Sequence, residues 1–140
     1  MASRDEIADT LAGFAIFADL STAALQQVAH TFEEAWYPDG ARILRQGLTG
    51  AGYFIILEGE AGIVHDGERI ATLGRGEFFG EPSLLLGESP VADVVALRPM
   101  RCLVLPGPAL EPFLLAHPSV MYRMLQTVAR RMRNAVRSQA

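Results

Sequence analysis

The sequence predicts a mainly β domain with flanking helices, built as a sandwich or a jelly-roll barrel. Three observations lead to this fold class. Short segments rich in β-branched and aromatic residues follow one another between residues 32 and 105. Turn-forming pairs, notably Asp39-Gly40 and Asp66-Gly67, separate some of them. Helical patterns with one apolar face lie before and after this region.

Two helices are expected before the β region. Ser3 and Glu6 have the spacing of a capping box, and apolar residues follow from Ile7 at helical intervals. Ser21 is placed to cap a second helix over residues 22–32. The period of the pattern changes after this second helix, which marks the start of the strands.

The expected strands are short and closely spaced. They cover residues 32–37, 41–44, 52–58, 61–66, 69–73, 77–80, 91–97 and 101–105. Strands with so few residues between them favour an antiparallel sandwich or barrel over a parallel sheet. Pro106 and Pro108 end the β region, and a helix over residues 109–117 is expected to stop before Pro118.

Residues 119–140 carry the clearest helical pattern of the chain. Apolar residues step by 4, 3, 4 and 3, which is a two-heptad seam. The seam residues are Met121, Leu125, Val128, Met132 and Ala135. A helix of about 20 residues is roughly 30 Å long, more than a small barrel needs for cover. We therefore expect a homodimer through this helix, with packing of one apolar face on the body as the alternative.

Composition and length indicate one domain. Of the 140 residues, 50% are hydrophobic and 20% are charged, as in ordinary globular chains. Residues 1–118 are expected to form the N-terminal helices and the β body, and residues 119–140 the C-terminal helix of the same domain. The acidic N-terminus has no hydrophobic segment of a signal peptide. Because Cys102 is the single cysteine, the sequence excludes an internal disulfide, which fits a cytoplasmic location. Cys102 lies in an apolar segment, so we expect it to be an inert thiol in the core.

The charges are unevenly distributed. All 12 basic residues are arginine; residues 1–118 hold 7 arginines and 16 acids, a balance of −9, and residues 119–140 hold 5 arginines and no acid. The negative charge of residues 1–118 disfavours nucleic-acid binding by the chain as a whole. The basic tail alone has a charge that is compatible with such binding. Neither a nucleic acid nor a membrane is an expected partner of this chain.

No motif predicts catalysis, a metal or a bound cofactor. The glycine-rich segment at residues 74–80 is one residue too long for a dinucleotide-binding fingerprint, and no βαβ unit surrounds it. The histidines, His30, His65 and His117, have no metal-ligand spacing. G-x-S-x-G, H-E-x-x-H and P-loop motifs are absent from the sequence. We therefore expect a non-enzymatic protein.

A series of short motifs carries a more specific signal. The motifs are F-x-x-L at 17–20, Y-x-x-G at 37–40, I-L-x-Q-G at 43–47, Y-F-I-I-x-E-G at 53–59, G-x-F-F-G-E at 76–81, L-L at 84–85, A-x-V at 92–94 and a helix that begins near His117-Pro118. In order and spacing they resemble the cyclic nucleotide-binding domain family, which includes the catabolite activator protein and the protein kinase A regulatory subunits. The resemblance covers residues 12–137. It implies an eight-stranded β-roll, a short helix in a phosphate-binding cassette and a long C-terminal helix.

The resemblance also implies a ligand site in the cassette. Its predicted residues are Gly80, Glu81, Pro82, Ser83, Ser89, Pro90, Val91, Ala92 and Asp93. In the family, the glutamate at the position of Glu81 accepts the ribose 2′-hydroxyl. Backbone N–H groups at the positions of Ser83 and Val91 approach the cyclic phosphate. A proline such as Pro82 suits the first turn of the cassette helix, where backbone N–H groups favour an anion.

The cassette departs from the family pattern where the phosphate would bind. Pro90 stands where the family usually has an arginine, and Asp93 where it has Thr or Ser. A charge-assisted phosphate contact contributes roughly 1.5–3 kcal/mol, and a carboxylate about 4 Å from the phosphate costs on the order of 1–4 kcal/mol. The sum of roughly 3–6 kcal/mol corresponds to about a hundred- to ten-thousand-fold weaker binding. Arg75, Arg98 or a helix arginine such as Arg130 are the candidate replacements.

The C-terminal helix departs from the pattern as well. Where the catabolite activator type offers hydroxyl groups to the purine, a gap-free alignment places Ala135 and Val136. No helix-turn-helix pattern follows in this chain.

Three functions stay open on the sequence. The first is a regulatory domain with weak or no binding of cAMP or cGMP, which acts through protein contacts or another small ligand. The second is a functional cAMP or cGMP sensor with a rearranged phosphate contact. The third is the sensor half of a Crp-like transcriptional regulator, or nucleic-acid binding by the basic tail.

Overall fold

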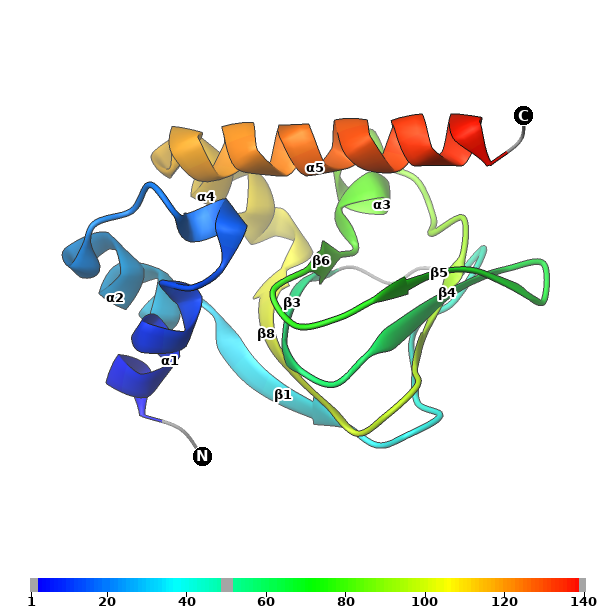
Figure 1. The fold of residues 1–140 in the computed structure, drawn as a ribbon, viewed down its shortest axis with the longest axis horizontal. Helices are drawn as coiled ribbons and strands as arrows, with labels where there is room; N and C mark the ends of the chain where they lie inside the picture. Colours follow the sequence, from blue (N-terminus) through cyan, green and yellow to red (C-terminus); the bar gives the residue numbers. More distant parts are fainter. Residues whose placement is uncertain (1–2, 49–51, 139–140) are drawn as a thin grey trace.

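A computed structural model describes residues 3–48 and 52–138 of the chain (Figure 1). Its helices are α1 (Arg4–Leu11), η1 (Ala15–Phe17), α2 (Thr22–Thr31), α3 (Glu81–Leu86), η2 (Gly107–Ala109), α4 (Leu110–Ala116) and α5 (Pro118–Arg137). Its strands are β1 (Glu33–Tyr37), β2 (Arg42–Leu44), β3 (Gly52–Glu58), β4 (Ala61–His65), β5 (Glu68–Leu73), β6 (Phe78–Phe79), β7 (Asp93–Ala96) and β8 (Met100–Pro106). The described residues thus form a mainly β domain with flanking helices, as predicted.

The strands form two antiparallel sheets of four strands each. One sheet has the order β1-β8-β3-β6 and the other β2-β7-β4-β5. Within residues 3–48 and 52–138, only β4 and β5 form a simple hairpin between neighbours in sequence, through Asp66 and Gly67, both with positive φ. The turn at Asp39-Gly40 instead leads the chain from the first sheet to the second, because β1 pairs with β8 and β2 with β7. This crossing between sheets makes the structure a roll.

The N-terminal helices begin where the sequence predicts. The Ser3 hydroxyl accepts a hydrogen bond from the Glu6 backbone N–H, and the Ser21 hydroxyl accepts one from that of Ala24, both at 3.2 Å. The Arg4 guanidinium donates to the carbonyl oxygens of Ala29 and Phe32, so it ties α1 to the end of α2. Figure 1 shows both helices together at one end of the roll.

The core has two parts on opposite faces of the first sheet. Residues of β3 and β8 that face the helices, such as Tyr53 and Leu103, pack against α1, α2, α4 and α5. Residues that face the other way, such as Phe54 and Cys102, fill the interior of the roll. Cys102 is fully buried, and burial raises the pKa of its thiol to about 12, which fits an inert core residue.

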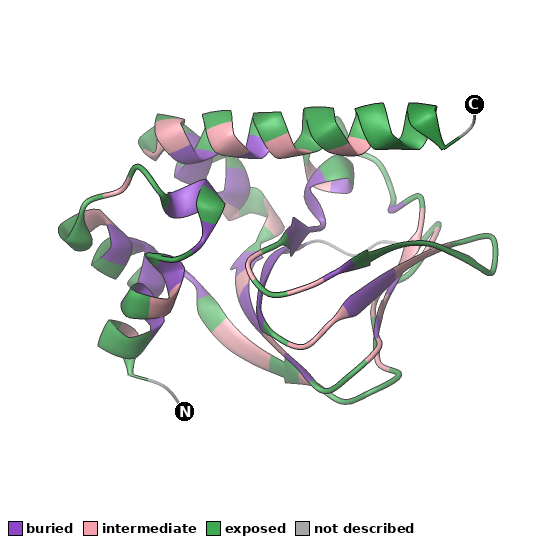
Figure 2. Cartoon of the chain, in the orientation of Figure 1, coloured by how far each residue is buried: buried purple, intermediate pink, exposed green. Residues whose placement is uncertain are grey.

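Helix α5 runs along one side of the molecule, and α3 lies below it in the view of Figure 1. Val120 and Met124 are its buried residues, and they face the body. The seam residues instead lie on the solvent side, and Figure 2 shows a largely exposed helix. One apolar face of α5 thus packs on the body, but this face is not the seam. Pairing of two copies through the seam stays a prediction.

Candidate functional site

The cassette begins with a glycine that the backbone requires. Gly80 has a φ of +95°, and a Cβ at this position would lie 2.1 Å from the carbonyl oxygen of Gly52. Beside it, the rings of Phe54 and Phe79 stack in parallel with centroids 4.7 Å apart. Gly80 therefore lets the segment from β6 to α3 lie against β3, and this close contact fixes where α3 starts.

Glu81 is the first residue of α3 and is only 2% exposed. Its Oε1 accepts a hydrogen bond of 3.1 Å from Arg131, whereas its buried Oε2 has no partner among the described residues. Burial raises the pKa of the Glu81 carboxyl to about 7, although the nearby Arg131 acts in the opposite direction. The site thus holds a buried carboxyl group with one oxygen free to bond a ligand hydroxyl.

Arg131 connects this carboxyl group to the C-terminal helix. Its guanidinium donates 2.7 Å to the carbonyl oxygen of Phe78 and lies 4.4 Å from the centroid of the Phe78 ring. Arg131 was missing from the sequence-based candidates, which included its neighbour Arg130. Val120, Met124 and Arg131 follow one another at helical intervals of four and seven residues, so they lie on one face of α5. The sequence alone did not show that this face is the one that packs on the body.

The other candidate arginines are held elsewhere. Arg75 donates to the carbonyl oxygen of Leu57, and Arg98 pairs with Glu60 at 2.8 Å. Arg130 donates to the hydroxyl of Thr127 on its own helix.

The far end of the cassette contacts the loop at residues 46–47 and the end of β4. Pro90 is buried, and its carbonyl oxygen accepts a hydrogen bond of 2.8 Å from the Gly47 backbone N–H. The Asp93 carboxylate accepts 2.6 Å from the Gln46 backbone N–H. The carbonyl oxygen of Val91 is hydrogen bonded to His65 Nδ1 at 2.8 Å. Asp93 is therefore occupied in holding a loop, a contact that the sequence did not reveal.

The remaining predicted residues lie between these two ends. Ser83 is buried, and its hydroxyl donates to the carbonyl oxygen of Gly80. Pro82 is the second residue of α3 and is exposed, as is Ser89, while Ala92 is half-buried. All nine predicted residues thus form one segment from the start of α3 to the start of β7. The segment carries three acidic residues and no basic one.

Ala135 and Val136, predicted at the position of the purine-binding hydroxyls, lie in the last turns of α5. Both are exposed, and Ala135 follows Arg131 by one helical turn.

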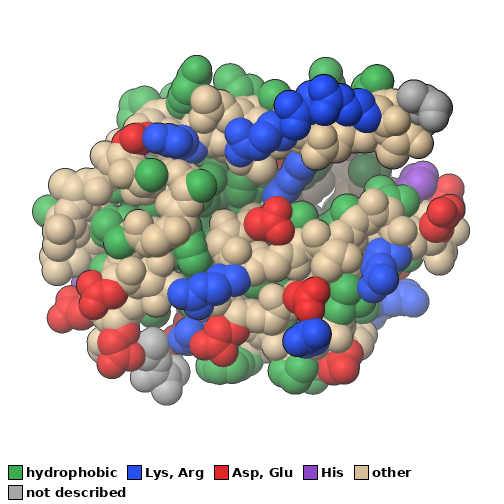
Figure 3. Space-filling view, in the orientation of Figure 1, with side chains coloured by type: hydrophobic (Ala, Val, Ile, Leu, Met, Phe, Trp, Pro, Cys, Tyr) green, Lys and Arg blue, Asp and Glu red, His purple; other side chains and the backbone are tan. Residues whose placement is uncertain are grey.

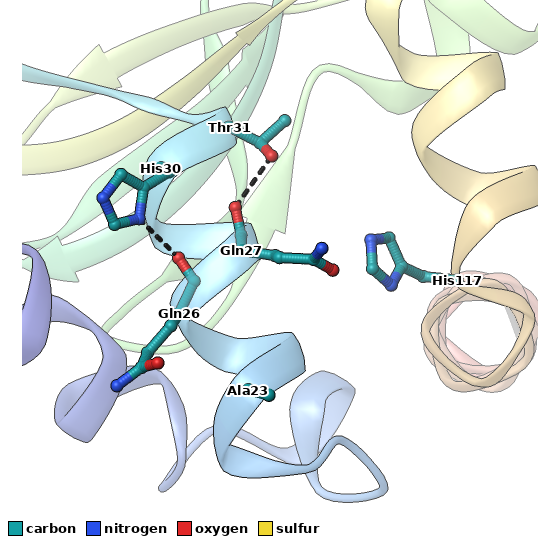
Figure 4. A pocket seen from close by; sticks show the side chains of 6 residues that line it. All are labelled: Ala23, Gln26, Gln27, His30, Thr31 and His117. Atoms are coloured by element: carbon teal, nitrogen blue, oxygen red, sulfur yellow. Dashed lines mark hydrogen bonds between the residues drawn. The ribbon is translucent and has the colours of Figure 1, made fainter.

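A separate pocket lies between α2 and the junction of α4 with α5 (Figure 4). Its volume is about 550 Å³, and it is lined by Ala23, Gln26, Gln27, His30, Thr31 and His117. The Gln27 side chain points toward His117, whereas His30 lies on the other side of α2 and bonds the Gln26 carbonyl oxygen. Within the described residues, no group of His, Cys, Asp and Glu is placed to hold a metal ion.

Comparison with known proteins agrees with this fold and cassette. The family model of the cyclic nucleotide-binding domain matches residues 34–117. The match covers more than half of the chain, so the chain belongs to the cyclic nucleotide-binding domain family. The cGMP-dependent protein kinase egl-4 of Caenorhabditis briggsae is 32% identical over 105 residues, which are 71% of this chain and 14% of the kinase. The chain thus spans only a small part of that kinase.

Solved structures extend the likeness to nearly the whole chain. The catabolite activator protein of Thermus thermophilus has a TM-score of 0.78 at 28% identity, over 89% of this chain and 61% of that one. The regulatory subunit of a cAMP-independent protein kinase A from Trypanosoma brucei has a TM-score of 0.82 at 24% identity, over 98% and 50%. A mutant of it with cAMP bound at one site has a TM-score of 0.76 at 25% identity, over 89% and 46%. This chain therefore has the fold of cyclic nucleotide-binding regulatory domains. No helix of the described residues is long and apolar enough to cross a membrane.

Proposed function

We propose that this protein is a non-catalytic regulatory domain with weak or no affinity for cAMP and cGMP, which acts through protein contacts or another small ligand. One observation carries the proposal: the cassette offers a cyclic phosphate no cation. Pro90 stands at the usual place of the arginine, and its carbonyl oxygen is bonded to the Gly47 N–H. Asp93 adds a negative charge to the same end of the cassette.

The arginines of the described residues support the same conclusion. Arg75 and Arg98 hold other partners. Arg131 contacts the cassette, where it pairs with Glu81 at the opposite end from Pro90. Its release toward a phosphate would leave the buried Glu81 carboxyl without its partner, which costs free energy.

The trypanosome relative supports a reversible loss of affinity. That regulatory subunit belongs to a cAMP-independent kinase, and cAMP is bound in a mutant with three substitutions, one of which replaces threonine by arginine. By analogy, we expect an arginine in place of Pro90 to increase the affinity of this chain for a cyclic nucleotide. Loss of one charge-assisted phosphate contact is worth roughly 1.5–3 kcal/mol, or about ten- to a hundred-fold in affinity.

Calorimetric titration with cAMP and cGMP tests the proposal. We expect no saturable binding of either nucleotide by the natural chain at ligand concentrations of about 1 mM. The Pro90→Arg/Asp93→Thr variant should bind at least about a hundred-fold more tightly, since it gains a cation and loses an anion. Pro99→Arg, which adds the same charge at an exposed proline outside the cassette, is the matched control and should gain nothing.

A functional cyclic nucleotide sensor is the second candidate, and the free oxygen of Glu81 favours it. The buried Oε2 has no partner among the described residues, and a ribose hydroxyl could donate to it. Micromolar binding of cAMP or cGMP by the natural chain, lost in Glu81→Ala, would establish this second function and refute the first.

A further inference from the structure

One face of α5 is fixed against the body by several contacts. The Tyr53 hydroxyl donates to the sulfur of the buried Met124. Arg123 makes a two-bonded ion pair with Asp19, with distances of 2.9 and 3.0 Å. Arg131 binds Glu81, two turns further along the helix. These contacts determine which side of the helix remains in solvent.

The solvent side presents an apolar stripe, which we call the α5 stripe. Its exposed fractions range from 37% for Val128 to 70% for Met132. The α5 stripe consists of Met121, Tyr122, Leu125, Val128, Met132 and Val136. Figure 3 shows hydrophobic side chains along this helix beside a row of basic ones. A continuous exposed apolar surface of this kind is typical of an interaction site.

The spacing of the stripe fits a second helix better than a lipid bilayer. Met121, Leu125, Val128 and Met132 step by 4, 3 and 4, the seam that packs knobs into holes of a facing helix. Helices that lie in a membrane surface use Trp, Phe and Leu on the apolar face, and of these the α5 stripe has only Leu125.

The charges beside the stripe indicate the chemistry of the partner. Arg130, Arg133 and Arg137 make no ion pair within the described residues, and their side-chain contacts include only Thr127 and Asn134. The helix itself has no acidic residue. A second copy of α5 would bring three more such arginines to the interface, and like charges oppose association. An acidic helix would supply the missing counter-charges.

We propose that the α5 stripe docks an amphipathic helix of a partner protein, with acidic residues beside its apolar seam. This inference rests on the proposed function, since it names the protein contact through which the domain acts. Two copies of this chain, a lipid surface and a nucleic acid are the competing occupants.

Fluorescence anisotropy with a synthetic peptide tests the proposal. The probe is about three heptads long, with Leu at the seam positions and Glu at the flanking ones. A second peptide has Lys in place of every Glu. We expect the full chain to bind the Glu peptide, to bind the Lys peptide at least about ten-fold more weakly, and to lose affinity as NaCl rises from about 0.05 to 0.5 M.

Variants of the chain locate the site. Leu125→Glu should weaken binding of the Glu peptide at least about ten-fold, because it places a carboxylate in the apolar seam. Leu115→Glu is the matched control, since Leu115 is exposed on α4 to the same extent, 63% against 61% for Leu125, and should bind like the natural chain. Arg133→Glu/Arg137→Glu should bind more weakly than the natural chain and should reverse the preference toward the Lys peptide.

Four results would overturn the proposal. They are no binding of the Glu peptide at about 0.1 mM protein, equal binding of both peptides, a homodimer in sedimentation that Leu125→Glu dissociates, and tighter binding to duplex DNA or anionic vesicles than to the Glu peptide. The nucleotide titration is independent of these readouts. Micromolar cAMP binding would refute the proposed function and leave the docking result standing, and absence of peptide binding would do the reverse.

Discussion

The two ends of the cassette differ in the contacts that hold them. At the start, Gly80 and Glu81 are buried and contact β3 and α5. At the end, Pro90 and Asp93 bond the backbone of a loop at residues 46–47. The first end combines a buried carboxyl group with a glycine that the fold needs, whereas the second carries a carboxylate and no basic residue. The comparison teaches that the two ends of one short segment can be fixed in different ways: the first by burial against β3 and α5, the second by hydrogen bonds to a neighbouring loop.

Substitution of Gly80 is the strongest way to break the first end. Gly80→Ala should destabilise the domain by on the order of 4 kcal/mol, because the methyl group would meet the Gly52 carbonyl oxygen and φ is positive. Gly87→Ala, at the other end of α3, also has a positive φ but meets no atom within 4 Å. It should cost only about 1 kcal/mol. Equal urea unfolding midpoints for the two variants would contradict the close contact at Gly80.

The pH dependence of stability tests the burial of Glu81 at the same end of the cassette. The pKa of Glu81 is about 7 in the folded chain and near 4.5 in the unfolded one, so the native state binds the proton more tightly. Stability from this group is therefore present below about pH 4.5 and is lost as the pH rises to 7. Between pH 5 and 8 we expect a loss of about 2–3 kcal/mol that Glu81→Gln removes.

Two charged or titratable side chains face Glu81 from the neighbouring elements, Arg131 on α5 and Tyr53 on β3. Arg131→Met removes the cation that lowers the pKa of Glu81, so the pH-dependent region should move to higher pH. Unfolding by urea at several pH values measures both effects. An unchanged difference between the natural chain and Glu81→Gln across this range would refute the assignment.

At the second end the expected effect is smallest. Asp93→Ala removes the acceptor of the Gln46 N–H, so we expect a loss of about 1 kcal/mol in the free energy of unfolding. Asp93→Asn keeps an oxygen at the same place and should lose clearly less. Denaturant unfolding distinguishes the two variants, and the bond has no structural role if both are equally stable.

Much of the fold could be predicted from the sequence because it depends on local periodicity. Strand-length apolar segments, Ser3 and Ser21 as caps, and Pro118 as a helix boundary are all properties of short stretches. The resemblance to a family gave the eight-stranded β-roll but not the order of its strands, since no local pattern specifies that β1 pairs with β8 rather than with β2.

The site was harder to predict because its contacts are long-range. Asp93 and Gln46 are 47 residues apart in the sequence, and Arg131 and Glu81 are 50 apart. On α5, two apolar patterns share one helix, and the sequence does not specify which of them packs on the body. Burial of Val120 and Met124 turns Arg131, rather than Arg130, toward the cassette. Only tertiary packing decides between neighbours on a helix.

The contact between Arg131 and Glu81 also affects how readily any other molecule can bind the Glu81 carboxyl group. Both residues belong to one chain, so the guanidinium is present beside Glu81 at an effective concentration of the order of millimolar or more. A free molecule that binds Glu81 must displace the Arg131 guanidinium, which stays nearby because it belongs to the same chain. The tethered arginine thus raises the concentration that any free molecule needs in order to bind Glu81.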